Sequence, residues 1–247
     1  MYNRNEIKQI IFRLDFDQNI AHNVTFDSSF IEAILKEFSI TELDKVEKQT
    51  YLKNNGSDII ADVKEIITKK YSSLDGKSSI KFNSNAIIFD FKTYVDYSNF
   101  NEIINDILNS FFNTNDKIIV SRVGFRFLNA FDHNKYDCDD FNNRYSVFLR
   151  DCKNFEDNIL VNRSMLKDEF VFDNIKANVN FGYYNPAYPS QLSIKHILLD
   201  IDAMHFGSVS KYQDLKNIID SEHDLIDVLF ENYINDNMRK KLGRSDA

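Results

Sequence analysis

The chain has little proline, glycine or cysteine and no tryptophan, and these scarcities exclude several classes of protein. Among 247 residues there are only six glycines and two prolines, which excludes a collagen-like repeat, and only two cysteines, which excludes a small disulfide-bonded scaffold. Acidic residues outnumber basic ones by 38 to 30, so the formal net charge is −8. This balance excludes a general nucleic-acid coat.

Long hydrophobic runs are missing as well. No apolar stretch approaches the ~18 residues that a membrane span needs, and no apolar segment follows the first residues, so we expect no membrane span and no secretory signal. Cys138 and Cys152 lie fourteen positions apart and do not form a metal-binding spacing. We therefore expect reduced thiols in a cytoplasmic protein.

What the chain does have is enough apolar material for a core. Hydrophobic residues make up 43% of it and aromatic residues 14%. Strict alternation of apolar residues at 10, 12, 14 and 16 predicts a strand over residues 10–17 with one apolar face. Asp27 stands before apolar residues at helical spacing, which predicts a helix over 28–38.

Turn signals divide the rest of the first half. The segment Asn54-Asn55-Gly56 predicts a hairpin between strands at 49–53 and 59–71. Strands follow at 80–82 and 86–94, and Ser98-Asn99 is predicted to cap a helix that runs through Phe111.

The second half repeats this order loosely. The pattern predicts a strand at 117–131, a polar loop at 132–143, one or two strands at 170–184, a tyrosine-rich loop at 183–189, a strand at 192–203 and one amphipathic helix at 214–242 that ends at Gly243. We expect an α+β fold, mostly antiparallel sheet with a long C-terminal helix. Residues 1–247 are read as a single domain, and two similar halves would divide near 114–117.

Three segments resemble a known family. They are the strand Arg122-Val123-Gly124-Phe125-Arg126-Phe127-Leu128-Asn129, the strand Leu198-Leu199-Asp200-Ile201-Asp202, and the closing helix from His223 through Phe230-Glu231 to Leu242-Gly243. In this order they resemble the hallmark segments of a sporadically distributed family of uncharacterised prokaryotic proteins. The resemblance implies a cytoplasmic prokaryotic protein whose patchy inheritance is typical of antiphage defence modules, and it implies no activity.

The arginine strand offers candidate ligand-binding residues. Arg122 and Arg126 share one strand face with a glycine between them, and two guanidinium groups ~13 Å apart can flank a phosphate-bearing ligand. Equally, both can pair with carboxylates on a neighbouring strand, for which Asp200 and Asp202 are natural candidates because they share a strand face. Together with Asn129, these four residues form the candidate ligand-binding set.

A metal-dependent site is a sharper alternative. Asp15 and Asp17 form a second Asp-x-Asp, and four carboxylates on adjacent strands can hold Mg²⁺ and orient a nucleoside triphosphate. However, the chain has neither a Walker A motif nor Gly-x-Gly-x-x-Gly. His196 shares the face of Asp200, where a hydrogen-bonded structural role is favoured over that of a base or metal ligand. We assign no catalytic residue, metal or cofactor.

Two functions remain open from sequence alone. The favoured one is a non-enzymatic interaction or regulatory protein of a prokaryotic defence or toxin–antitoxin-type system, with a protein partner and with a homodimer left open. The alternative is a nucleotide- or phosphate-ligand-binding domain, metal-dependent or not, that uses the Arg122/Arg126 and Asp200/Asp202 face. The alternative requires these side chains to be open to solvent rather than paired with one another.

Overall fold

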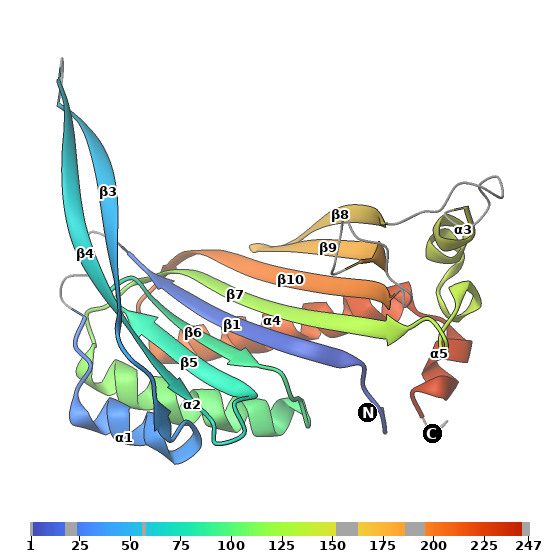
Figure 1. Cartoon of the computed structure of the whole chain (residues 1–247), viewed down its shortest axis with the longest axis horizontal. Coiled ribbons are helices and arrows are strands. Elements are labelled where there is room, and N and C mark those ends of the chain that lie inside the picture. Colours follow the sequence, from blue (N-terminus) through green and yellow to red (C-terminus); the bar gives the residue numbers. More distant parts are fainter. Residues whose placement is uncertain (1, 18–23, 56–57, 152–162, 186–195, 244–247) are drawn as a thin grey trace. The chain divides into compact units, whose positions relative to one another are not determined.

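The computed structural model describes residues 2–17, 24–55, 58–151, 163–185 and 196–243. They form an α+β fold with a large antiparallel sheet, as predicted (Figure 1). The elements in chain order are β1 (Ile7–Phe16), α1 (Ser28–Glu37), β2 (Ile40–Thr41), β3 (Lys45–Asn55), β4 (Asp58–Ser72), β5 (Ser78–Asn83), β6 (Ala86–Phe91), α2 (Tyr97–Thr114), β7 (Val120–Asp132), the 3₁₀ helix η2 (Cys138–Asp140), α3 (Asn143–Asp151), β8 (Ser164–Phe172), β9 (Ile175–Tyr184), β10 (His196–Val209), α4 (Tyr212–Tyr233) and α5 (Asp236–Lys241).

The strand order is β2-β4-β5-β6-β1-β7-β10-β9-β8, and β3 pairs with β4. The chain divides into two compact units, each described separately below. Unit 1 comprises Met1–Ile10, Gly124–His205 and Asn217–Ala247, and unit 2 comprises Ile11–Val123 and Phe206–Lys216. Strands β1, β7 and β10 contribute residues to both units.

Unit 2 has an aromatic core beneath its strands. Helices α1 and α2 lie on one face of its sheet (Figure 1). Phe30 of α1 and Phe111 of α2 have ring centroids 5.5 Å apart, and Phe30 lies 5.1 Å from Phe82 of β5. All three side chains are fully buried, and burying such rings supplies the largest favourable term in folding.

Local sequence signals predicted most elements of unit 2. Alternate residues of β1 are buried at 10, 12, 14 and 16, which confirms the predicted apolar face. The carboxylate of Asp27 accepts the backbone N–H of Phe30 and caps α1, also as predicted. For α2 the predicted cap is wrong by two residues. Asp96 is the cap, because its carboxylate accepts the N–H of Asn99 at 2.8 Å.

A β-bulge separates β2 from β3. Thr41 lies opposite Tyr71, whereas Lys45 lies opposite Thr68. Four steps along one strand therefore match three steps along β4, which is the one-residue excess that defines a bulge. It follows that β2 and β3 lie along the same edge of β4, while β5 pairs with its opposite edge through Lys69–Ser72.

In unit 1, β10, β9 and β8 form an antiparallel meander. The prediction of one or two strands over 170–184 matches β9, whereas β8 begins at Ser164, six residues before the predicted range. The two strands are joined at Asp173, which has a φ of +50°. The predicted strand over 192–203 is β10, whose described residues begin at His196. Residues 192–195, Cys152 and most of the tyrosine-rich loop lie outside the described residues.

The predicted polar loop at 132–143 is a packed segment in the structure. It contains η2, in which Asp137 and Asp140 form a capping box, and it buries Cys138, Asp140 and Phe141. Helix α3 follows it and was not predicted. The Cys138 sulfur lies 3.6 Å from the hydroxyl of Tyr183, and the thiol is free.

The predicted long C-terminal helix is present as α4, but its predicted continuation to residue 242 is wrong. Helix α4 ends at Tyr233 and α5 begins at Asp236. The Asn235 side chain explains the break, because its oxygen accepts the N–H groups of Asn237 and Met238 while its amide donates to the carbonyls of Asp139 and Phe141. A cap held by the neighbouring segment starts a new helix. Among the described residues, no helix combines the length and apolarity that a bilayer crossing requires.

Candidate functional site

The predicted ligand-binding residues of unit 1 lie around the adjacent strands β7 and β10. Helix α4 contacts one face of β7, where Phe125 and Phe127 have ring centroids 6.3 and 6.0 Å from that of His223. Arg126 alternates with these phenylalanines and therefore lies on the opposite face, hereafter the open face. On β10, Asp200 and Asp202 alternate with Leu199 and Ile201, both of which are fully buried.

Arg126 and Asp200 form a two-point ion pair. Arg126 Nε donates to Asp200 Oδ1 at 2.6 Å, and Nη2 donates to Oδ2 at 2.8 Å. The Asp200 side chain is 4% exposed and that of Arg126 is 39% exposed. Asn180, which lies opposite Asp200 in the β9–β10 register, adds a third donor at 3.2 Å. Both carboxylate oxygens of Asp200 are thereby engaged within the protein.

The charge of this pair is balanced inside the sheet. The hydrogen bonds from Arg126 to Asp200 raise the pKa of the guanidinium above its ordinary value, and the negative charge of Asp202 adds to this effect. Burial of Arg126 acts in the opposite direction and is outweighed.

Asn129 and Asp202 have different surroundings. Asn129 is 4% exposed, and its amide donates to the backbone carbonyl of Leu199 at 3.3 Å, so it joins β7 to β10. Asp202 is half-buried and lies opposite Asn178 in β9. Their part in binding a ligand stays a prediction.

Arg122 belongs to unit 2 and has other partners. Its Nη1 lies 3.5 Å from Asp15 Oδ2, and its guanidinium stacks over the ring of Phe206 at 5.9 Å. Arg13, on the same strand as Asp15, donates to both oxygens of that carboxylate at 2.6 to 3.1 Å. Two arginines therefore share Asp15, which makes it an ion-pair partner rather than a metal ligand.

The described residues give no support to the predicted magnesium site. Among them, no three His, Cys, Asp or Glu side chains are grouped so that they can hold a metal ion. The buried Nδ1 of His196 has no hydrogen-bond partner in the described part of the chain, and the hydrogen-bonded role of this histidine stays a prediction.

Sequence reasoning missed two residues that shape the open face. Asn180 alternates with buried Val179 and Phe181, so its face could be read from the sequence, but its pairing with Asp200 depends on strand register. Gly182 has a φ of +146°, and a Cβ there would lie 2.2 Å from the carbonyl oxygen of Ser164. A lone glycine within a strand pattern was the available signal for this close approach.

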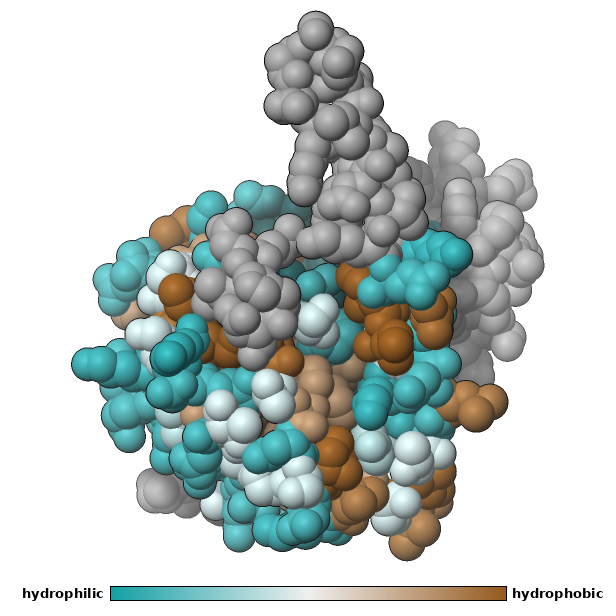
Figure 2. Space-filling view, turned by 90° about the vertical axis from the view of Figure 1, so that its left-hand side faces the viewer, coloured by the Kyte–Doolittle hydropathy of each residue, from teal (hydrophilic) through white to brown (hydrophobic). Residues whose placement is uncertain are grey.

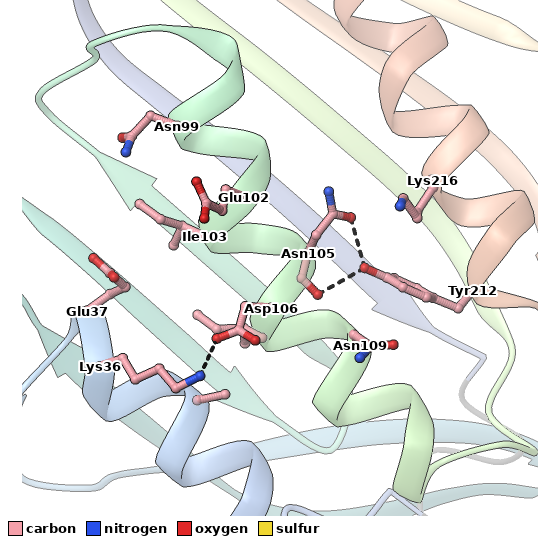
Figure 3. A pocket seen from close by; sticks show the side chains of 12 residues that line it. Lys36, Glu37, Asn99, Glu102, Ile103, Asn105, Asp106, Asn109, Tyr212 and Lys216 are labelled. Carbon is pink, nitrogen blue, oxygen red and sulfur yellow. Dashed lines mark hydrogen bonds and ion pairs between the residues drawn. The ribbon is translucent and has the colours of Figure 1, made fainter.

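A groove of about 730 Å³ lies in unit 2 between α1, α2 and the start of α4 (Figure 3). Two pairs of its polar side chains interact with one another. Lys36 Nζ lies 2.7 Å from Asp106 Oδ2, and the hydroxyl of Tyr212 lies 2.8 Å from Asn105 Oδ1. None of the predicted site residues lines this groove.

The ribbon formed by β3 and Asp58–Thr68 of β4 is the second candidate site, an interface. It contains eleven register pairs, from Lys45–Thr68 to Asn55–Asp58. Strand β5 pairs with β4 only at Lys69–Ser72, so the two ribbon strands continue beyond it as a pair (Figure 1). In the described part of the chain, no third strand pairs with the ribbon.

Exposed apolar side chains gather where the ribbon leaves the sheet. Val46 and Ile67 are register partners and are 56% and 53% exposed, and nearby Leu43 is 96% exposed. Figure 2 shows a face of the molecule on which hydrophobic residues form small patches between hydrophilic ones. On that face, therefore, no single broad apolar patch competes with the ribbon as an interaction surface.

Comparison with known proteins adds no assignment. No protein-family model matches the chain, and no curated protein matches it either. The resemblance to the sporadically distributed prokaryotic family therefore stays an expectation.

Proposed function

We propose that this chain is a non-enzymatic interaction protein that binds a protein partner through the β3–β4 ribbon. The observation that carries the proposal is the ribbon itself, eleven register pairs long with no third strand among the described residues. At ~3.4 Å per residue, its strands run for about 34 Å.

The ribbon has physical reasons to seek a partner. A two-stranded ribbon is only marginally stable in water, whereas three or more strands support one another. Among the described residues, no strand pairs with either outer edge of the ribbon, and an added strand from another chain satisfies the backbone N–H and C=O groups there. The exposed Val46–Ile67 pair at its base adds apolar surface to the same region.

The open face supports the same proposal indirectly. Arg126 and Asp200 hold β7 to β10, and Asn129 bonds to the β10 backbone, so these residues act within the fold. The nucleotide- or phosphate-binding alternative stays a prediction, and no observation favours it, because two nitrogens of Arg126 already donate to a buried carboxylate.

The biological setting of the proposal comes from the family resemblance. We place the protein in the prokaryotic cytoplasm, in a defence or toxin–antitoxin-type system whose other component is the partner. A regulatory protein of this kind needs a stable scaffold and one adaptable contact element, which is the division between sheet and ribbon proposed here.

A pull-down from the native host tests the proposal. In the shortened variant, Asn-Gly replaces residues 47–66 and closes a two-residue hairpin between the register partners Val46 and Ile67. The intact chain should enrich a host protein that the shortened variant loses, while Lys167→Ala on β8 keeps it. Equal enrichment by the intact and shortened chains, or none by the intact chain, would contradict the proposal.

We also propose that the chain consists of two similar halves. Each half begins with a strand (β1 or β7), continues with a helix and a run of strands, and then has a further helix. In each half the first strand neighbours the last one, β6 or β10, and the order continues through β5 or β9 to β4 or β8. An experimental structure whose halves fail to superpose over these strands would contradict this idea.

A further inference from the structure

Among the described residues, the edge of β4 that faces away from β3 has no partner strand along Asp58–Ile67. β2 and β3 occupy one edge of β4, and β5 occupies the other edge only at Lys69–Ser72. From Ile67 to Asp58, no strand pairs with the β5 side of β4 among the described residues, whereas the amide of Asn83 at the end of β5 donates to the Thr68 hydroxyl at 3.0 Å. An open edge ten residues long is sufficient for a further strand.

We propose that a second copy of this chain fills the edge, with its own β4 antiparallel to the first and Val63 on the twofold axis. The inference rests on the proposed function only in that both use the ribbon. The sequence of Asp58–Thr68, Asp-Ile-Ile-Ala-Asp-Val-Lys-Glu-Ile-Ile-Thr, is nearly symmetric about Val63. Pairing it with itself in this register puts Ile60 opposite Ile66, Ile59 opposite Ile67 and Asp62 opposite Lys64.

The charges of Asp62 and Lys64 favour this register over the two registers in which the axis is shifted by one residue. The twofold axis places Asp62 opposite Lys64 twice, and opposite charges on facing strand positions are favourable. Antiparallel pairs alternate between two hydrogen-bonding types, so a symmetric pair of strands must have one residue facing its own copy. Moving the axis by one residue places either Asp62 or Lys64 opposite itself, which sets like charges against each other.

The proposed assembly also resolves the instability of the ribbon. The two ribbons join as β3-β4-β4-β3, a four-stranded sheet, which exceeds the three strands needed for independent stability. The contact is isologous, with Ile59–Ile67 on each side, so it closes at a dimer and leaves no second open β4 edge for growth.

Charge reversal on the intact chain tests the proposed register. The wild-type chain should sediment as a dimer of twice 29.0 kDa. Lys64→Asp places two aspartates opposite one another, Asp62→Lys places two lysines opposite one another, and each should weaken dimerisation about tenfold. The double variant with both changes should recover the wild-type dissociation constant, and an equimolar mixture of the two single variants should form the heterodimer.

A control and three contrary results complete the test. Lys53→Asp makes the same charge change on β3 and should leave the dimer intact. A wild-type monomer at 100 μM, a dimer that neither single variant weakens, or a double variant that stays monomeric would each overturn the proposal. The proposed function can be tested separately from the dimer. If monomeric Lys64→Asp still captures the host partner, that function stands without the dimer.

Discussion

Asp200 is the more buried member of the Arg126–Asp200 ion pair, and we expect its burial to determine how much each variant of the pair destabilises the protein. The two side chains differ tenfold in exposure, at 39% for Arg126 and 4% for Asp200. Arg126→Ala leaves a carboxylate in the sheet with only the amide of Asn180 as a donor, whereas Asp200→Ala leaves a guanidinium that water can reach. We therefore expect the arginine variant to be the less stable of the two.

The expected loss of free energy of unfolding depends on which charged group each variant leaves without its partner. Stranding a buried charge costs about 3–5 kcal/mol, and the partial exposure of this pair places Arg126→Ala near the lower end, at about 3 kcal/mol. Asp200→Ala loses hydrogen bonds between charged groups but strands no buried charge, which corresponds to about 1.5 kcal/mol. For a chain of this length each kcal/mol lowers the melting temperature by roughly 2–4 °C.

Urea unfolding of the two single variants and the double variant forms a complete cycle. The free energy of unfolding of the double variant should lie close to that of Asp200→Ala. Without the carboxylate of Asp200, the loss of Arg126 no longer leaves a buried charge unpaired. Lys167→Ala, which breaks an exposed ion pair with Glu169 on the same sheet, is the matched control and should leave the midpoint unchanged. Equal losses for Arg126→Ala and Asp200→Ala, or a larger loss for Asp200→Ala, would refute this reasoning.

Three further predictions concern local structure. In urea unfolding, Gly182→Ala should lower the free energy of unfolding by more than about 3 kcal/mol, because the added Cβ would lie 2.2 Å from a carbonyl oxygen. Gly76 has open space around it and a φ of +68°, so Gly76→Ala should lower this free energy by only about 1 kcal/mol. Asn235→Ala should lose about 2 kcal/mol with the α5 cap, whereas the exposed helical change Asn109→Ala should not lower the melting temperature. Burial raises the pKa of Tyr212 to about 12, so its contribution to stability is complete below pH 10 and is lost as the pH rises from 10 through 12. Tyr212→Phe should flatten that alkaline loss in thermal melts, and an unchanged slope would contradict the assignment.

Sequence patterns predicted the elements whose signals are local. Period-two alternation in β1 and the Asp27 cap of α1 depend on neighbouring residues, so both were correct. The break before α5 depends on contacts between Asn235 and a segment more than ninety residues earlier, which no helical pattern reveals. The apolar stripe from Ile234 to Met238 continues across the break, which is why a single helix was predicted.

The candidate site shows the same division between local and non-local information. Alternation correctly placed Arg126 and Asp200 on strand faces and named each as a partner for the other. It could not give the strand order, so it could not show that β7 and β10 are adjacent. Asn180 was missed for the same reason, since its place beside Asp200 is a matter of register.

The interleaved make-up of the two units constrains how this polypeptide is made. Unit 1 combines the first ten residues with Gly124–His205 and Asn217–Ala247, and unit 2 needs Phe206–Lys216. A chain emerging from the ribosome therefore cannot finish either unit until about nine-tenths of it has been synthesised. Until β10 has been made, β7 has β1 on one side and an unsatisfied edge on the other, which is the kind of surface that chaperones shield during translation.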